Sequence, residues 1–236
     1  VSAAFYLPEM SQVRNPRHLK ALLLACANQG VQFHPGTPII GFEQDASRIT
    51  GVRTATETFR AGRTVIAGGA WSPEVLCHLG LQCELVPVQG QIVLLSVNRL
   101  PFRQVIECGK QYLVPRSDGR ILIGSTESHV GFNKQNTAEG VGGLIRFAES
   151  VVPGLKEATF ERAWAGLRPK SIDGLPYLGP VTGYENLLMA AGHYRDGLQL
   201  SPITARLMKQ LICGEETELS LEPFSCSRGM RENEER

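Results

Sequence analysis

The sequence lacks the short motifs that identify several large classes of functional site. Its 236 residues contain no GxGxxG dinucleotide fingerprint, no P-loop and no GxSxG nucleophile elbow. They contain no HExxH or EF-hand pattern, and the six cysteines include no CxxC pair. Neither a P-loop nucleotide hydrolase, nor an α/β-hydrolase, nor a familiar zinc or calcium site is indicated, and we expect no bound metal.

The sequence also lacks an excess of charge of either sign, and it lacks long apolar runs. Lys and Arg number 24 and Asp and Glu 23, and this balance indicates no electrostatic surface for nucleic acid. No apolar run approaches the roughly 20 residues that span a bilayer. Scattered cysteines are typical of reduced thiols. We therefore expect a cytoplasmic protein with no nucleic-acid or membrane partner, and the oligomeric state, a homo-oligomer included, is left open.

Mixed helix and strand signals predict an α/β or α+β architecture. Each expected helix begins at a capping residue or proline and ends near a glycine or proline; the ranges are 15–30, 72–80, 137–152 and 201–214. The first helix should carry an apolar stripe of Leu19, Leu22, Leu23 and Cys26. Strands are expected in β-rich runs, which are 32–34, 38–43, 49–54, 57–60, 64–67, 92–96, 111–114 and 120–124. Ser117-Asp118-Gly119 is typical of a hairpin turn.

Two arginines stand in apolar surroundings. Arg168 lies in Trp164-Ala165-Gly166-Leu167-Arg168-Pro169, and Arg195 follows an apolar run in Gly192-His193-Tyr194-Arg195-Asp196-Gly197. A guanidinium stays charged at working pH, and burying it without a partner is costly. A bidentate arginine suits a carboxylate or phosphate ligand. Internal salt bridges to Asp173 and Asp196 explain the pattern equally well, so both interpretations stay open.

Two further features carry little information alone. Thr64 to Ser72 predicts a strand, a glycine pair and a helix start, and such glycines allow a ligand to approach the backbone closely. Many strand-to-helix turns use glycine, so this pattern identifies no ligand. Tyr112 lies in a predicted strand, where packing is the default interpretation of a tyrosine.

Five stretches give the chain a resemblance to a known family. They occur in the family's order and are VIAGGAWSPEV (65–75), PVQGQ (87–91), YLVPRSDGRILIGSTE (112–127), WAGLRPKSIDGLPYLG (164–179) and NLLMAAGHYRDGLQLSPITARLM (186–208). On these stretches the chain resembles the D-amino-acid-oxidase-like FAD-dependent oxidoreductases, and most closely the glycine oxidase (ThiO-type) branch. The last two stretches are the most specific.

The resemblance implies a domain organisation. The family carries its GxGxxG motif at the N-terminus, and this chain begins with Val1 after that point. Residues 8–80 and 166–224 are expected to be the remaining parts of an FAD-binding domain with a mixed sheet. Residues 81–165 should form an antiparallel substrate-binding domain, with 1–7 as a candidate additional strand. The polar stretch 225–236 is expected to be a disordered tail.

The resemblance also implies site residues. Arg168, Arg195 and Tyr112 occupy the positions that bind the substrate carboxylate. The positions whose backbone lies along FAD are Ile39 at the adenine end and His193, Tyr194, Arg195, Asp196, Gly197, Leu198 and Gln199 beside the flavin. Two residues near the pocket depart from the branch: Lys110 stands where it can carry His, and Glu127 where it can carry Met. Glu127 is a candidate acceptor for the substrate amine, or else a solvent-facing carboxylate.

The implied reaction is oxidative deamination of a small amino acid such as glycine, sarcosine or a D-amino acid. FAD is reduced, the imine is hydrolysed to a 2-oxo acid, and dioxygen yields hydrogen peroxide. In thiamine biosynthesis the glycine imine is itself the product. The alternatives are a D-amino acid or amine dehydrogenase with another electron acceptor, or a non-catalytic fragment or binding module. Without the phosphate-binding motif, this chain alone is expected to purify without FAD and without activity.

Overall fold

The computed structural model describes residues 3–232 and divides the chain into two compact units, Val1–Thr37 and Pro38–Arg236. The first unit contains helix α1 (Asn15–Asn28), which begins one residue before Pro16 and is followed by Gly30 at a left-handed φ of 83°. Residues 3–7 form no strand, so they add none to a sheet; Val1 and Ser2 lie outside the described residues.

The expected apolar stripe of α1 is present but is not buried. Leu19, Leu22 and Leu23 are 58%, 46% and 52% exposed, and no residue of α1 is buried. The expected strand at 32–34 is also absent. An amphipathic helix is buried only when another element packs on its apolar side, and among the described residues of this unit α1 is the only regular element.

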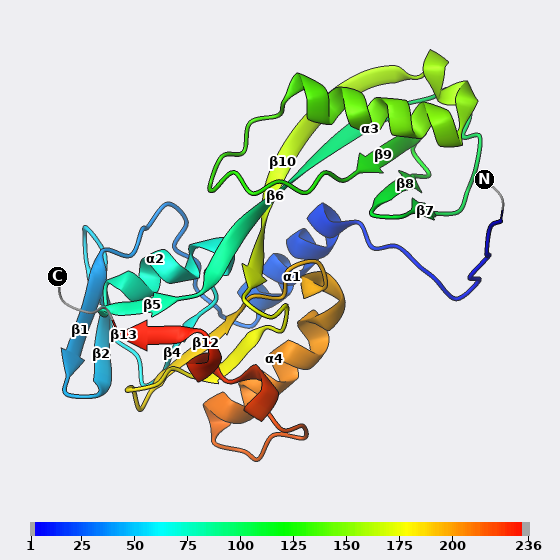
Figure 1. Cartoon of the computed structure of the whole chain (residues 1–236). Coiled ribbons are helices and arrows are strands. Elements are labelled where there is room, and N and C mark those ends of the chain that lie inside the picture. Colours follow the sequence, from blue (N-terminus) through cyan, green and yellow to red (C-terminus); the bar gives the residue numbers. More distant parts are fainter. Residues whose placement is uncertain (1–2, 233–236) are drawn as a thin grey trace. The chain divides into compact units, whose positions relative to one another are not determined.

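The second unit contains a five-stranded antiparallel sheet in the order β10-β6-β9-β8-β7 (Figure 1). These strands are β6 (Leu85–Ser96), β7 (Ile106–Cys108), β8 (Gln111–Pro115), β9 (Arg120–Gly124) and β10 (Thr159–Ser171). Helix α3 (Ala138–Val151) covers one face, and its Leu144 and Ala148 are fully buried against strand residues such as Val93, Leu113 and Ile123. A 3-10 turn, η2 (Pro153–Glu157), leads from α3 into β10.

A second group of elements surrounds a separate core that includes Tyr177, Leu187 and Met189. A three-stranded sheet has the order β11-β12-β4, in which β12 pairs parallel to β4 and antiparallel to β11. The elements are β4 (Thr64–Ile66), η1 (Gly69–Trp71), α2 (Ser72–Cys77), β11 (Tyr177–Pro180), β12 (Leu187–Ala191) and α4 (Gly197–Cys213). A small sheet, β1 (Gly41–Asp45), β2 (Arg48–Arg53) and β3 (Thr58–Phe59), completes this group.

The long ladder between β6 and β10 connects the two cores. It runs from the pair Ser96 and Thr159, beside α3, to the pair Leu85 and Ser171, and Leu85 belongs to the core around Tyr177. The mixed α/β fold expected from the sequence is confirmed by these helices and by the parallel and antiparallel sheets. Among the described residues, no helix has both the length and the apolar character needed to cross a membrane.

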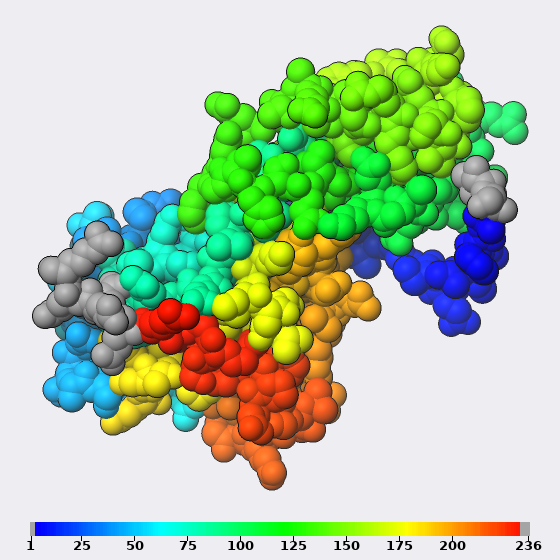
Figure 2. Space-filling model, viewed as in Figure 1, coloured from blue at the N-terminus to red at the C-terminus, as the bar shows by residue number. Residues whose placement is uncertain are grey.

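The expectation of a disordered tail is wrong for residues 225–232. After η3 (Glu222–Phe224), η4 (Cys226–Arg228) leads into β13 (Met230–Glu232), which pairs antiparallel with β5 (Leu81–Cys83). Figure 2 shows these red atoms lying against cyan and yellow atoms of the same unit. Cys226 is 1% exposed in the core and Met230 packs beside it, so two apolar residues anchor a stretch of polar composition. Residues 233–236 lie outside the described residues.

Helix α4 begins earlier than expected. It starts at Gly197 rather than near Ser201, and Pro202 lies within it. Proline cannot donate to the carbonyl four residues earlier, and the Leu198 carbonyl accepts instead from the Ser201 hydroxyl at 2.8 Å. The proline therefore stands inside the helix without leaving that carbonyl unpaired.

Candidate functional site

The five-stranded sheet places Arg168 and Tyr112 on the face opposite α3. Side chains alternate along a strand, and Val93, Leu113 and Ile123 point into the core beneath α3. In the ladder register, Tyr112 is paired with Gly124 and Arg168 with Val88, each an odd number of residues from that core set. These side chains therefore belong to the other face.

Two glycines leave room for these side chains. A Cβ at Gly90 would overlap the guanidinium of Arg168, and a Cβ at Gly124 would overlap the phenol ring of Tyr112. Each large side chain thus lies flat over a glycine of a neighbouring strand. A larger residue at Gly90 or Gly124 would displace the corresponding side chain, so the position of both groups depends on glycine.

Arg168 is held by neutral oxygen atoms. Its guanidinium donates to the Ser125 hydroxyl and, at 3.2 Å, to the carbonyl of Thr126. The nearby Asp173 pairs with Arg228 instead. Among the described residues no carboxylate pairs with Arg168, so the internal salt bridge considered from the sequence is not formed. The guanidinium keeps its charge available for an anionic ligand.

Arg195 reaches the same region from the turn between β12 and α4. It donates a long hydrogen bond, 3.5 Å, to the carbonyl of Lys110, which directly precedes β8. Arg195 makes no ion pair within the described part of the chain, and the neighbouring Asp196 is the N-cap residue of α4. The structure therefore brings Arg195 to the strand that carries Tyr112.

The turn that carries Arg195 is closely attached to the end of β10. The Tyr194 amide donates to the Pro169 carbonyl at 2.9 Å, and His193 forms an isolated β-bridge with Lys170. Tyr194 has a left-handed φ of 51°, and the Lys170 ammonium lies 5.7 Å from the centre of its ring. A non-glycine residue in this conformation is held there by its surroundings.

Glu127 forms the acidic part of this region. Its carboxylate pairs with the Lys110 ammonium at 3.2 Å. The pKa of Glu127 is lowered, first by the Tyr194 hydroxyl and then by Lys110, with a further contribution from the charge of Arg195. The Tyr194 hydroxyl is buried and has no hydrogen bond of standard geometry in the described residues, but it faces Glu127 closely enough to dominate this effect. Burial, followed by Glu127, raises the pKa of Tyr194.

The residues expected along the flavin form a continuous run. His193 accepts from or donates to the Thr204 hydroxyl at 2.9 Å, and burial lowers its pKa. Gly197, Leu198 and Gln199 form the first turn of α4. Ile39 precedes β1 and, within the described residues, makes no hydrogen bond with this run. The structure thus groups Tyr112, Arg168 and Arg195 with the turn at 193–196.

Some neighbours of these residues were not expected from the sequence. Ser125 and Thr126 hold Arg168, and Lys170 lies over Tyr194. Period-2 alternation at the start of β8 could have placed Lys110, the residue before the strand, on the same side as Tyr112. The partners of Arg168 and Tyr194 lie on other strands, and no local pattern indicates them.

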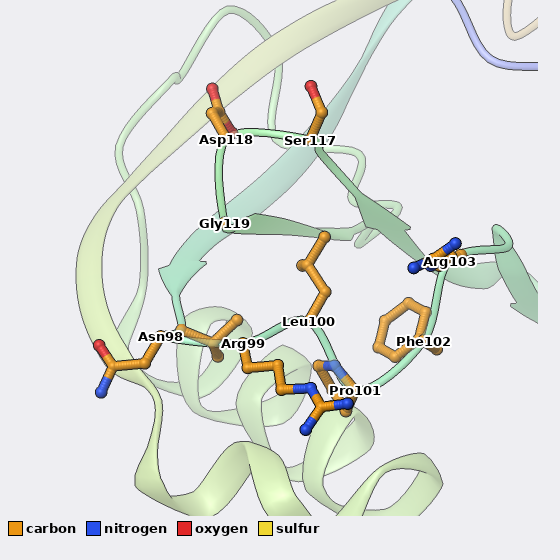
Figure 3. A pocket seen from close by; sticks show the side chains of 10 residues that line it. Asn98, Arg99, Leu100, Pro101, Phe102, Arg103, Ser117, Asp118 and Gly119 are labelled. Carbon is orange, nitrogen blue, oxygen red and sulfur yellow. The ribbon is translucent and has the colours of Figure 1, made fainter.

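The structure contains a cavity of about 560 Å³ that includes neither Arg168 nor Arg195. It lies at the far end of β6 and is lined by residues 97–103 and 117–119 (Figure 3). Ser117 and Asp118 point away from the loop that carries Arg99 (Figure 3). A second cavity of about 410 Å³ is lined by Cys83–Val86, His129 and Lys170–Ile172. Neither includes Arg168 or Tyr112, and no group of three metal-ligating side chains exists among the described residues.

Comparison with known proteins gives consistent matches. Residues 1–211 match the family described as "DAO: FAD dependent oxidoreductase". The glycine oxidase of Pseudomonas putida is 40% identical over 225 residues, which cover 94% of this chain and 61% of that protein. Hydrogen cyanide synthase subunit HcnC of Pseudomonas aeruginosa is 39% identical over 221 residues, which cover 92% of this chain and 52% of that protein.

A solved structure extends this similarity to the fold. The crystal structure of glycine oxidase from Geobacillus kaustophilus superimposes with a TM-score of 0.85 at 35% identity. The match covers 90% of this chain and 58% of that one. The chain thus spans about three fifths of the length of these two glycine oxidases.

Proposed function

The chain belongs to the DAO family of FAD-dependent oxidoreductases, and on that premise we propose that it forms the substrate side of an enzyme that oxidises a small amino acid. The proposed substrates are glycine, sarcosine or a small D-amino acid. The products are the imine, its 2-oxo acid and, with dioxygen as acceptor, hydrogen peroxide. The observation that carries this proposal is the Arg168 guanidinium, which pairs with no carboxylate in the described part of the chain and lies on the same sheet face as Tyr112.

The residues between β4 and α2 fit one side of an FAD site. Gly69 has a left-handed φ of 55°, and no atom lies within 4 Å of where its Cβ would be. The buried Ser72 hydroxyl, close to Gly68, has no hydrogen-bond partner in the described residues. Backbone without side chains and an unused hydroxyl suit the close approach of a planar ligand. The phosphate-binding GxGxxG element does not occur in this sequence.

We assign the backbone of Ile39 and of residues 193–199 to FAD contacts. FAD supplies the two-electron acceptor for the oxidation when it is bound. The chain's own residues orient the amino acid: Arg168 and Arg195 bind its carboxylate, and the Tyr112 hydroxyl completes that site. The protein thereby holds the carbon that carries the nitrogen in one orientation.

We also propose the domain division 8–80 with 166–224 for FAD and 81–165 for substrate. The antiparallel sheet of β6 to β10 supports a substrate domain, and the parallel pairing of β4 with β12 supports an FAD domain. The boundary between 165 and 166 falls inside β10, so this strand would serve both domains.

The test is substitution of Arg168 in FAD-loaded protein prepared with a GxGxxG-containing segment joined to this chain, because the chain alone is expected to purify without FAD. Arg168→Ala should weaken glycine binding and slow flavin reduction. The lost stabilisation should be about 2–5 kcal/mol of free energy, because a charge-assisted bidentate contact is lost. Arg195→Ala should have a smaller effect. Arg162→Ala is the matched control, since Arg162 is on the same strand and its guanidinium lies over Trp164 instead. Unchanged kinetics in Arg168→Ala would contradict the proposal.

A dehydrogenase that uses another electron acceptor is the second candidate. The 39% identity to the HcnC subunit favours it, since that protein is named as part of a hydrogen cyanide synthase rather than as an oxidase. Measuring hydrogen peroxide and dye reduction with the same amino acid separates the two. Stoichiometric peroxide supports the oxidase, and dye reduction without peroxide supports the dehydrogenase.

A further inference from the structure

We propose that Glu127 binds the nitrogen of the substrate, and that Lys110 occupies this carboxylate until the substrate arrives. The proposal rests on the function proposed above, because it assigns the second polar group of an amino acid whose carboxylate the arginines hold. Glu127 and Lys110 would then determine which carboxylate ligands are accepted. No proton or hydride transfer is assigned to either residue.

Glu127 is placed next to the carboxylate site by chain continuity. Residues 124–127 continue without a break from the last residue of β9: Gly124 lies under Tyr112, and Ser125 and Thr126 accept from Arg168. Glu127 is the next residue. In an α-amino acid only one carbon separates the carboxylate from the nitrogen. A group that binds the nitrogen must therefore lie beside the group that binds the carboxylate.

The charges in this region match those of an amino acid. Arg168, Arg195 and Lys110 are positive, and Glu127 is the carboxylate to which Lys110 pairs. A simple carboxylate ligand would need only the positive groups. An acidic side chain between Tyr194 and Lys110 adds a place for a cation or a hydrogen-bond donor, which the substrate nitrogen supplies.

Lys110 is suited to be displaced. Its side chain is 73% exposed, whereas that of Glu127 is 24% exposed. An ion pair whose lysine is this open to water contributes little, because solvent screens it and the flexible side chain loses entropy. A substrate nitrogen fixed by its own carboxylate loses less freedom on pairing with Glu127. Exchange of Lys110 for the substrate is therefore favourable.

Glu127 is suited to remain an acceptor. The Tyr194 hydroxyl and Lys110 hold the pKa of this carboxyl below its ordinary value, so the group stays ionised throughout the neutral range. An ionised carboxylate has only acceptor oxygens and a negative charge, and a low pKa means that it takes up protons poorly. Its contribution should therefore be seen in ligand selection.

The test uses two ligands that differ only at the nitrogen. 2-Aminoisobutyrate and 2-hydroxyisobutyrate share carboxylate and methyl groups, and neither carries the Cα hydrogen that oxidation would remove. Calorimetry measures the affinity of each for the FAD-loaded protein, and the ratio isolates the contribution of the nitrogen. The variants are Glu127→Gln, Lys110→Met and the control Glu161→Gln, which removes a carboxylate paired with Arg120 on the same sheet.

The proposal predicts opposite changes in the two site variants. Glu127→Gln should lower the preference for the amino acid about tenfold, since a hydrogen bond to a charged group is lost. Lys110→Met should raise the preference by removing the competitor, and Glu161→Gln should leave it unchanged. An unchanged ratio in Glu127→Gln, or a decrease in both site variants, would overturn the proposal, because a purely structural ion pair responds in the same direction to loss of either partner.

Failure of the proposed function gives a different result. In that case neither ligand would bind to the wild-type protein, or Arg168→Ala would leave both affinities unchanged. If the function holds and only the inference about Glu127 fails, Arg168→Ala weakens both ligands while Glu127→Gln preserves their ratio. The two failures are thereby distinguished with the same ligands.

Discussion

The two faces of the five-stranded sheet differ in composition: one is a packed apolar surface, and the other carries the candidate binding residues. On the face beneath α3, Val93, Leu113 and Ile123 are fully buried with Leu144. On the other face, two strand positions are glycine, and the side chains above them are Arg168 and Tyr112. The face beneath α3 is filled by apolar side chains, which exclude water. The opposite face has glycine at two positions, and the missing side chains leave room for a charged and an aromatic group.

This difference separates stability from ligand binding within a single sheet. Shortening any of a set of close-packed apolar side chains lowers the free energy of unfolding of the protein. Tyr112 and Arg168 are only partly buried, so changes there should alter ligand affinity more than folding. Substitutions on each face, measured for both properties, test whether this separation is real.

The largest expected effect is on the face beneath α3. Leu144→Ala should lower the free energy of unfolding by about 2–5 kcal/mol, because a fully buried side chain is replaced by a cavity. On the other face, Tyr112→Phe should change it by less than about 0.5 kcal/mol. Urea unfolding followed by circular dichroism measures both. Similar losses in the two variants would show that the faces do not differ in stability.

Local sequence signals predicted the elements around α3 well. Thr137 was expected to begin that helix, and its hydroxyl accepts from the Gly140 amide at 3.0 Å. Ser117-Asp118-Gly119 was expected as a hairpin turn, and it joins β8 to β9. Both are decided by residues within four positions of each other, where capping and turn chemistry act.

The remaining features depend on partners far away in the sequence. β13 is ordered because Met230 pairs with Cys83, and the polar composition of residues 225–236 gives no sign of it. The stripe of α1 was predicted as apolar, but whether it is buried depends on a second element that no local pattern specifies. The resemblance named Glu127 as a candidate near the pocket, but its neighbour Tyr194 lies 67 residues further along the chain, and no local pattern indicates that the two meet.

An intermediate effect is expected at Gly90. Gly90→Ala places a Cβ where the Arg168 guanidinium lies, and the flexible end of the arginine should move rather than the strand. Stability should therefore change little, while affinity for 2-hydroxyisobutyrate should fall about tenfold or more through misplacement of the charge. Gly166→Ala is the matched control, because Gly166 is paired with Gly90 and its Cβ would meet no atom within 4 Å. Equal affinities in the two variants would contradict this view of Gly90.

The smallest expected effect is a pH dependence of the free energy of unfolding that comes from His193, in the turn at 193–196. Burial lowers the pKa of His193, so the folded state favours the neutral ring that bonds to Thr204. The unfolded chain takes up a proton near pH ~6.5, before the folded state does. The stabilisation from neutral His193 is therefore present above that pH and is lost as the pH falls through the lowered folded value.

Comparison with His193→Gln isolates this contribution. The difference in the free energy of unfolding between wild type and His193→Gln should be largest above pH ~6.5 and should shrink towards pH 5. Leu144→Ala supplies the contrast, since Leu144 packs among apolar side chains beneath α3 and its loss should not vary over this range. Urea unfolding at pH 7.5, 6.5, 5.8 and 5.0, with all three proteins in the same buffers, gives the two differences. If the His193 difference stays constant with pH, the ring is protonated equally in both states. The attachment of this turn to α4 would then be independent of the charge on His193.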